Sequence, residues 1–231
     1  MTGRPDENLP LAIAHRSGNH LERLQPAVAA GADLIEADIW LHRGNLEVRH
    51  LKTLGPIPIL WDRWRLVSTR TSRLHLEDLL DVWPNGAELM VDIKGNEKAF
   101  PDALMKVLEE HLAGRPVTFS GRRWDLLDAL KGYPKARYFP SCGSQREVVE
   151  LLGSWRDFYD AAVLRASIVT PENVEAVRDA GGPVITWPIN TIEALDRVVG
   201  AGAVGVICDD LEIIRHLAAG RSGEPAGAGD D

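Results

Sequence analysis

The sequence is short of cysteine, of long apolar runs and of basic residues, and each shortage excludes a class of protein. Its 231 residues include two cysteines, Cys142 and Cys208, far apart and without the spacing of a zinc site or a disulfide framework. We interpret both as small buried hydrophobic side chains. No apolar run approaches the ~20 residues that a membrane-spanning helix needs.

The charge balance is acidic, with 26 Lys and Arg against 34 Asp and Glu and a formal net charge of −8. A protein that wraps nucleic acid needs clustered cations, so we expect no nucleic-acid partner. A small anionic substrate held in a local basic pocket stays compatible with this charge. The first ten residues are polar and carry no apolar core of a signal peptide, so we expect a cytoplasmic protein.

The chain alternates between apolar runs and segments with helical spacing. The apolar runs are nearly continuous in Val, Ile, Leu and Ala, as expected of strands buried on both faces. They cover residues 11–15, 33–40, 87–94, 116–120, 136–140, 161–165, 183–190 and 203–209. The segments with helical spacing that follow them cover residues 20–31, 74–83, 97–114, 123–132, 146–155, 170–181, 191–202 and 211–220.

Eight strand–helix pairs in this order predict an α/β fold, a closed (β/α)8 or TIM barrel. We expect one domain over 11–219, between a polar arm at 1–10 and a loose tail at 220–231 that is rich in Gly, Pro and acidic residues. Gly220 is expected to end the last helix. The competing architecture is an open doubly wound sheet, but no G-x-G-x-x-G motif follows the first strand.

A long insertion separates the second predicted strand from the helix at 74–83. A connection of this length in a compact domain is usually functional or folded into a small structure of its own. We expect a short strand at 46–50 and a lid-like loop through 51–73. The stretch IPILWDRW (57–64) carries apolar and aromatic side chains, which could pack on the barrel or contact acyl chains at a lipid surface.

Charged side chains lie inside strands that should be apolar. Glu36 and Asp38 are two residues apart in one strand, as are Asp92 and Lys94 in another, and such pairs point to one face. Buried carboxylates are costly unless they are paired or bound to metal. Three of them at the carboxyl ends of adjacent strands would form an oxygen-ligand site that suits Mg2+ or Ca2+ better than zinc. The alternative is an ion-pair network with Arg16 and Lys94 and no metal.

Two histidines leave strands close to this acidic cluster. His15 ends the first strand and His50 ends the strand expected in the insertion. Imidazole titrates near neutral pH, so the two could act as general acid and general base. Arg16 and Lys94 would face the same pocket. Fixed cations beside a divalent metal indicate an anionic substrate, for which phosphate is the natural candidate.

The run IAHRSGN…GADLIEADIWLHRGNLEVRH resembles the N-terminal block of glycerophosphodiester phosphodiesterases. In that family a His-Arg pair follows strand one, a Glu-x-Asp pair lies on strand two, and a His follows a short β-extension. VDIKG resembles the family's acidic-x-Lys strand three, and FS at 119–120 matches a strand-four Ser. VITWPIN and AVGVICDD resemble its last two strands, where a Trp and an Asn face the pocket and an Asp closes the barrel.

This resemblance implies a hydrolase that depends on Mg2+ or Ca2+ and cleaves glycerophosphodiesters. The products would be a phosphomonoester such as glycerol phosphate and an alcohol, and the partner would be a small-molecule phosphodiester. The resemblance gives His15 and His50 the acid–base role. It gives metal binding to Glu36, Asp38 and Asp92, and substrate binding to Arg16, Lys94 and Trp187.

Two other functions stay open. The Asp92-x-Lys94 form also resembles related barrel phospholipases D, which attack sphingomyelin or lysophospholipids and can release cyclic phosphates. Such an enzyme would contact a lipid surface transiently. The other alternative is a non-catalytic barrel that binds a phosphorylated ligand, although a pure binding module has no need of the acid–base pair His15 and His50.

Overall fold

Eight parallel strands close into a barrel in the computed structural model, which describes residues 10–50, 52–54, 57–62, 65–68, 73–112 and 114–222. The hydrogen-bonded order is β1-β13-β12-β11-β10-β9-β8-β2, and pairing of β1 with β2 closes the ring. This confirms the predicted (β/α)8 barrel. The strands are β1 (Leu11–Ala14), β2 (Leu34–His42), β8 (Glu88–Lys94), β9 (Val117–Gly121), β10 (Ala136–Cys142), β11 (Ala162–Arg165), β12 (Val184–Trp187) and β13 (Gly205–Cys208).

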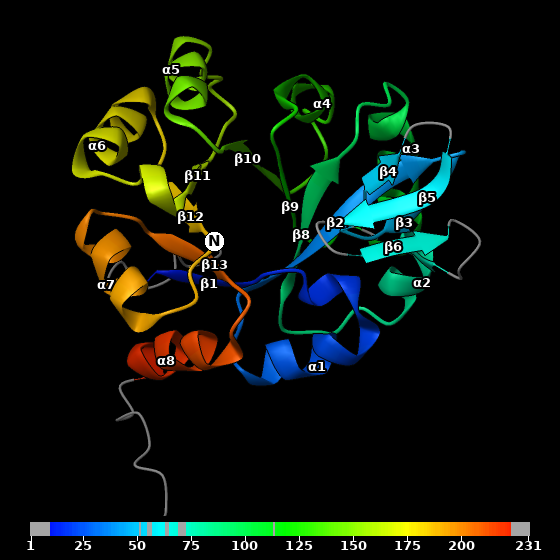
Figure 1. Ribbon diagram of the computed structural model, residues 1–231, viewed down its shortest axis with the longest axis horizontal. Helices are drawn as coiled ribbons and strands as arrows, with labels where there is room; N and C mark the ends of the chain where they lie inside the picture. Colours follow the sequence, from blue (N-terminus) through cyan, green and yellow to red (C-terminus); the bar gives the residue numbers. More distant parts are fainter. Residues whose placement is uncertain are drawn as a thin grey trace, which may run out of the picture.

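Helices surround the strands, as the view along the barrel in Figure 1 shows. Thr170 and Thr191 cap two of them by accepting a hydrogen bond from a backbone N–H of the first turn, as their sequence positions favour. None in the described part of the chain has both the length and the hydropathy to cross a membrane. They are α1 (Leu21–Ala29), α2 (Leu76–Asp81), α3 (Phe100–Leu112), α4 (Trp124–Ala129), α5 (Gln145–Gly153), α6 (Pro171–Ala180), α7 (Ile192–Gly200) and α8 (Leu211–Ser222), with short 3-10 turns η1 (Ser17–Asn19) and η2 (Ala166–Ile168).

Helix α8 continues past Gly220, where the sequence analysis expected it to end. Arg221 holds this last turn against the start of β2, because its guanidinium contacts the Asp33 carboxylate and donates a 2.9 Å hydrogen bond to the carbonyl of Gly31. A tertiary contact thus outweighs the local cost of a glycine within a helix.

Apolar side chains form two separate clusters, one on each side of the strands. The larger lies between the strands and the surrounding helices. The smaller fills the barrel with alternate residues of its strands, namely Ile13, Leu34, Met90, Phe139, Ala161, Val163, Ile185 and Ile207. Side chains two positions further along these strands therefore point into the carboxyl-terminal mouth of the barrel.

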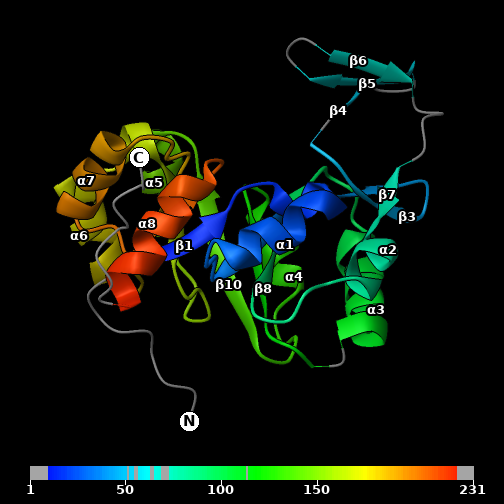
Figure 2. The same ribbon diagram turned by 90° about the horizontal axis from the view of Figure 1, so that it is seen from below.

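The strands of the insertion after β2 form two groups, one joined to the barrel sheet and one separate from it. The strand β3 (Asn45–Val48), expected at 46–50, pairs with β2, and β7 (Leu74–His75) pairs with β3. Beyond it β4 (Lys52–Leu54), β5 (Ile57–Asp62) and β6 (Arg65–Ser68) form a separate three-stranded antiparallel sheet, where we expected a loop. Figure 2 shows this sheet beyond β3 and β7 and clear of the helices. The side chains of the IPILWDRW stretch lie outside the described residues.

A buried ion cluster joins the two ends of this insertion. The Glu47 carboxylate accepts a 2.7 Å hydrogen bond from Nε of Arg49 and also contacts the guanidinium of Arg73. Arg49 in turn stacks on the ring of Trp40, 4.7 Å from its centroid. Because Arg49 precedes the small sheet and Arg73 follows it, Glu47 fixes both connections at the edge of the barrel.

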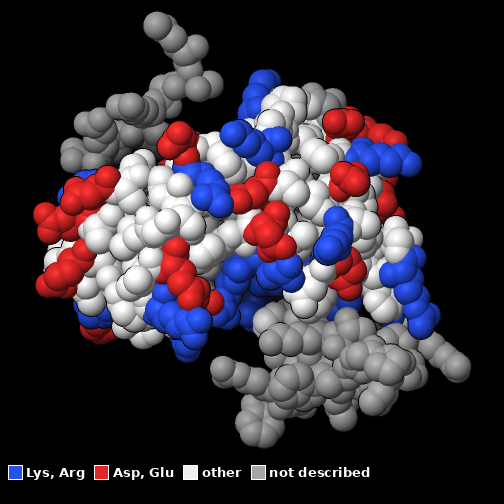
Figure 3. Space-filling model, turned by 90° about the horizontal axis from the view of Figure 1, so that it is seen from above, with Lys and Arg blue, Asp and Glu red and all other residues white. Residues whose placement is uncertain are grey.

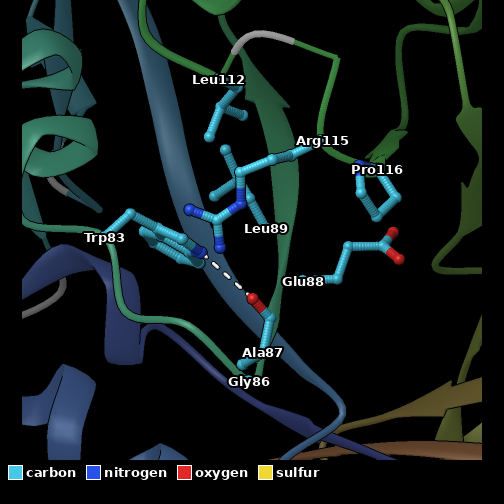
Figure 4. Close-up of a pocket in the computed structure, with 8 residues that line it drawn as sticks. All are labelled: Trp83, Gly86, Ala87, Glu88, Leu89, Leu112, Arg115 and Pro116. Atoms are coloured by element: carbon cyan, nitrogen blue, oxygen red, sulfur yellow. Dashed lines mark hydrogen bonds between the residues drawn. The ribbon is translucent and has the colours of Figure 1, made fainter.

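A hollow of about 230 Å3 lies at the opposite end of the barrel from the charged residues predicted to act. Figure 4 shows its lining around the start of β8, where Nε1 of Trp83 donates a 3.2 Å hydrogen bond to the carbonyl of Ala87. Arg115 also lines it, and its guanidinium is bound to the carbonyl of Pro84 at 2.9 Å. These contacts tie the α2–β8 and α3–β9 connections together, so we interpret this end as structural.

The turn η1 lies very close to β2 because Gly18 has no side chain. A Cβ atom at this position would be 2.7 Å from Cβ of Ala37 and 2.9 Å from the carbonyl oxygen of Glu36. Both neighbours belong to a buried strand and cannot move aside independently.

We expect Gly18→Ala to lower the free energy of unfolding by about 1–3 kcal/mol, the usual cost of overpacking a core. The matched control is Gly200→Ala in α7, where nothing lies within 4 Å of the added Cβ. A helix favours alanine over glycine, so the control should be neutral or stabilising by up to about 1 kcal/mol. Urea denaturation measures both changes, and equal values would contradict the close packing of η1 on β2.

Candidate active site

Three carboxylates meet at the carboxyl end of β2 and β8. Glu36 and Asp38 are 2% and 1% exposed, and Asp38 and Asp92 are paired partners across the two strands. One oxygen from each carboxylate lies within 4.8 Å of the other two. The structure therefore brings together the cluster that the alternation of residues in the two strands predicted.

Lys94 contributes a positive charge to this cluster. Its ammonium lies 2.9 Å from Oδ1 of Asp38 and also contacts the Asp92 carboxylate. Burial opposes ionisation of Asp38, but the charge and hydrogen bond of Lys94, the charge of His50 and the hydrogen bond from Asn19 together outweigh it, and the pKa of Asp38 is lowered. Burial and the charge of Asp38 raise the pKa of Glu36 to about 8. The cations in place thus do not offset the cost of ionising Glu36.

His15 lies between Glu36 and a carboxylate from the other end of the chain. Its Nδ1 is 2.7 Å from Oδ1 of Asp209, which follows β13, and its Nε2 is 3.8 Å from the Glu36 carboxylate. Burial disfavours the charged imidazole, but the hydrogen bond to Asp209 and the charge of Glu36 outweigh it and raise the pKa of His15. The same hydrogen bond lowers the pKa of Asp209 to about 2.

Arg16 contacts the cluster through both its backbone and its side chain. Its backbone N–H donates a 2.7 Å hydrogen bond to the Glu36 carboxylate, and its Nε lies 3.7 Å from Oδ2 of Asp38. The residue has a φ of 51°, a left-handed conformation that is unusual for a non-glycine residue. The backbone strain is compatible with a functional constraint, because it aims the N–H at a buried acid.

Asn19 is a residue of the site that the sequence analysis did not find. Its Nδ2 donates a 2.7 Å hydrogen bond to Oδ2 of Asp38, and its Oδ1 accepts a 2.9 Å hydrogen bond from the Asp38 backbone. This pair of bonds fixes the carboxylate relative to its own strand. The contact forms only because η1 folds over β2. An asparagine in a short loop does not by itself indicate such a contact.

His50 reaches the cluster from a different strand than His15. It follows β3, and its Nδ1 lies 3.9 Å from Oδ2 of Asp38. Its side chain is 31% exposed, against 10% for that of His15. Each imidazole thus lies within 4 Å of a carboxylate of the cluster, at the same end of the barrel.

The far wall of the mouth carries Trp187, Asn190 and Ser141. Trp187 packs against the apolar cluster inside the barrel, and its buried Nε1 has no hydrogen-bond partner among the described residues. Asn190 exchanges two hydrogen bonds with Asp209, at 3.1 and 3.0 Å, and so supports the partner of His15. Beside the acids, Ser120 is the register partner of Asp92 and is buried.

By sequence, neither a protein-family model nor a curated protein matches this chain. Solved structures do match. A phosphodiesterase from Oleispira antarctica, in complex with the product sn-glycerol-3-phosphate, is 19% identical with a TM-score of 0.72, over 91% of this chain and 97% of its own. The glycerophosphodiester phosphodiesterase from Thermotoga maritima is 21% identical with a TM-score of 0.68, over 90% and 98%.

A third such structure is a glycerophosphodiester phosphodiesterase from Parabacteroides distasonis, 17% identical, with a TM-score of 0.67 over 91% of this chain and 97% of its own. This chain has the fold of these proteins. The coverage extends over nearly the full length of each, so the likeness includes the whole barrel and not a shared fragment. At these identities the likeness establishes the architecture, and the chemistry has to be argued from the site.

We predict that Asp209→Asn lowers the pKa of His15 toward or below its usual value, because the substitution removes the charge that favours the imidazolium. The pKa is measured by NMR titration of the ring protons of His15 in the presence of EDTA. The matched control is Asp210→Asn, a neighbouring exposed carboxylate that instead accepts from the backbone of Glu212. An unchanged pKa in Asp209→Asn would show that this carboxylate does not support His15.

Proposed function

We propose that this protein is a metal-dependent phosphodiesterase that hydrolyses glycerophosphodiesters to a phosphomonoester, such as glycerol phosphate, and an alcohol. The observation that carries the proposal is that two imidazoles each lie within 4 Å of a carboxylate in a cluster of three at the mouth of the barrel. Active sites of this fold lie at that end. The sn-glycerol-3-phosphate bound to the Oleispira antarctica protein of the same fold supports the choice of substrate. The cytoplasmic location stays a prediction.

The residues at the site fit a divalent metal such as Mg2+ or Ca2+. Three carboxylates offer oxygen ligands that lie within 4.8 Å of one another, and carboxylate oxygens are the ligands that these hard cations prefer. Glu36, Asp38 and Asp92 would hold the ion. When bound, it would neutralise charge on a non-bridging phosphoryl oxygen. The fit is chemical as well as spatial, because a bound divalent ion would supply positive charge that favours ionisation of Glu36, whose pKa is raised to about 8.

Arg16 and Lys94 would bind the phosphoryl group of the substrate beside this cluster. An arginine offers a forked contact to phosphate and a lysine a compact point charge, and both cations already lie at the carboxylates. Positioned cations of this kind stabilise the charge that develops in the transition state.

The two histidines would move the protons of the reaction. Asp209 holds Nδ1 of His15 and so directs Nε2 of the same ring toward the acidic cluster. One imidazole would take a proton from the nucleophile, either water or a neighbouring hydroxyl of the substrate, and the other would protonate the leaving alcohol. A neighbouring hydroxyl would give a cyclic phosphate first.

The alternative of a barrel phospholipase D rests on the insertion after β2. Its small sheet extends from the strand that delivers His50, so an acyl chain or a lipid surface could reach the same site. Hydrolysis of lysophosphatidylcholine in preference to glycerophosphocholine would favour this alternative. Phosphorus NMR of the products would also reveal a cyclic phosphate.

We expect His15→Ala and His50→Ala each to lower kcat by about 10²–10⁴-fold, the usual contribution of a general acid or base. The matched control is His216→Ala on α8, which should keep its activity because the side chain is exposed on a helix outside the barrel. Circular dichroism checks that the variants fold. Near-normal turnover in either site variant would refute the acid–base pair.

Metal removal gives a separate test. EDTA should abolish hydrolysis, and Mg2+ or Ca2+ should restore it. The same ion should raise the melting temperature, since a ligand at 100 times its Kd stabilises a protein by about 2.7 kcal/mol. Asp92→Asn should lose this thermal shift, whereas Asp196→Asn, an exposed carboxylate on α7, should retain it. Full activity in chelator would contradict the metal site and favour the alternative, an ion-pair network without metal.

A further inference from the structure

Arg165 is a cation at the barrel mouth to which the proposed mechanism gives no role. It ends β11, two residues after Val163, whose side chain belongs to the apolar cluster inside the barrel. Residues two apart on a strand share a face, so Arg165 lies on the inner face at the mouth. It is the register partner of Trp187 on β12, and it is exposed.

These two residues lie across the mouth from the carboxylates. In the closed ring, β9 and β10 separate β8 from β11 on one side, and β13 and β1 separate β12 from β2 on the other. The strands that carry Arg165 and Trp187 are therefore diametrically opposite those that carry Glu36, Asp38 and Asp92. A substrate held at the acids by its phosphoryl group would extend toward this wall.

Arg165 differs from the other cations around the mouth in having no acidic partner. Arg16 and Lys94 contact Asp38, and Arg122 is paired with Glu147. Within the described ranges, no hydrogen bond or ion pair is formed by the Arg165 side chain. Figure 3 shows basic and acidic side chains interspersed over one face of the molecule.

The neighbouring Trp187 offers a second unused donor. Its Nε1 is buried and has no hydrogen-bond partner among the described residues, and its ring packs against the apolar cluster. A buried N–H without an acceptor costs free energy, so a site that leaves one unpaired is suited to a ligand that supplies the acceptor. A guanidinium and an indole N–H on adjacent strands both donate hydrogen bonds, and together they suit an anion.

We propose that Arg165 and Trp187 bind a second anionic group of the substrate, a carboxylate or a phosphate carried by the alcohol that leaves. This inference rests on the proposed function. The glycerol half of a glycerophosphodiester has no ionisable group, so the anion has to lie on the other alcohol. The same guanidinium would repel a quaternary ammonium head group. The site therefore selects diesters with acidic leaving alcohols over diesters of choline.

Two glycerophosphodiesters that differ in one group test this selectivity. Their leaving alcohols are 3-hydroxypropanoate and 3-hydroxypropanamide, which have nearly the same shape but only one of which is charged. For the wild type we expect kcat/KM to be about 10-fold higher for the carboxylate, the effect of one charge-assisted hydrogen bond. Arg165→Gln should bring this ratio of kcat/KM values to about one, and Arg165→Lys should retain part of the preference for the carboxylate. Arg146→Gln, which removes an exposed cation paired with Glu150, should leave it unchanged.

A ratio near one in the wild type, or a ratio that Arg165→Gln leaves intact, would overturn the inference. An equal loss on both substrates would also overturn it, because Arg165 would then contact the scissile phosphoryl group. If neither diester is hydrolysed, the proposed function fails separately. In that case isothermal titration of the wild type and Arg165→Gln with the same two diesters decides the role of Arg165. The wild type should bind the carboxylate diester about 10-fold more tightly than the amide diester, and Arg165→Gln should bind both equally.

Discussion

The convergence of three carboxylates at one end of the barrel, two of them buried, is the constraint on which the rest of the site depends. Glu36 and Asp38 are almost fully enclosed, and ionised acids in such an environment need compensating charge and hydrogen bonds. The backbone of Arg16, the amide of Asn19 and the ammonium of Lys94 supply them. Their combined effect is incomplete, because the pKa of Glu36 stays raised to about 8.

The two ends of the barrel hold different kinds of polar contacts, structural at one end and proposed to be catalytic at the other. A layer of apolar side chains fills its middle, and below it Glu88 is satisfied by hydrogen bonds from Thr118 and Arg137. In this lower network the charges of Glu88 and Arg137 are paired with each other. The upper layer holds the acidic cluster and, among the described residues, a buried donor without a partner in Nε1 of Trp187, as expected of a surface that meets a substrate.

Much of the site could be predicted from the sequence, because parallel strands impose a period of two. Glu36 with Asp38 and Asp92 with Lys94 interrupt otherwise apolar strands, and the register of β2 with β8 brings both pairs together. The contact of His15 with Asp209 joins residues 194 positions apart. Its partners meet only because β1 pairs with β13, so local spacing alone carried no signal of it.

The insertion after β2 was the least predictable part of the fold. Its strands pair with one another, and the alternation of strand and helix that marks the barrel is absent from it. Of the ions that fix its ends, Glu47 and Arg49 are separated from Arg73 by the small sheet itself. Prediction of such a contact requires the path of the chain and not only its composition.

The most direct test of the central claim is a crystal structure of the protein soaked with Mn2+, a divalent ion with a measurable anomalous signal. We expect an anomalous peak among the carboxylates of Glu36, Asp38 and Asp92, with the imidazoles of His15 and His50 on either side of it. Maps without such a peak at saturating Mn2+, with the ammonium of Lys94 still bridging Asp38 and Asp92, would contradict it.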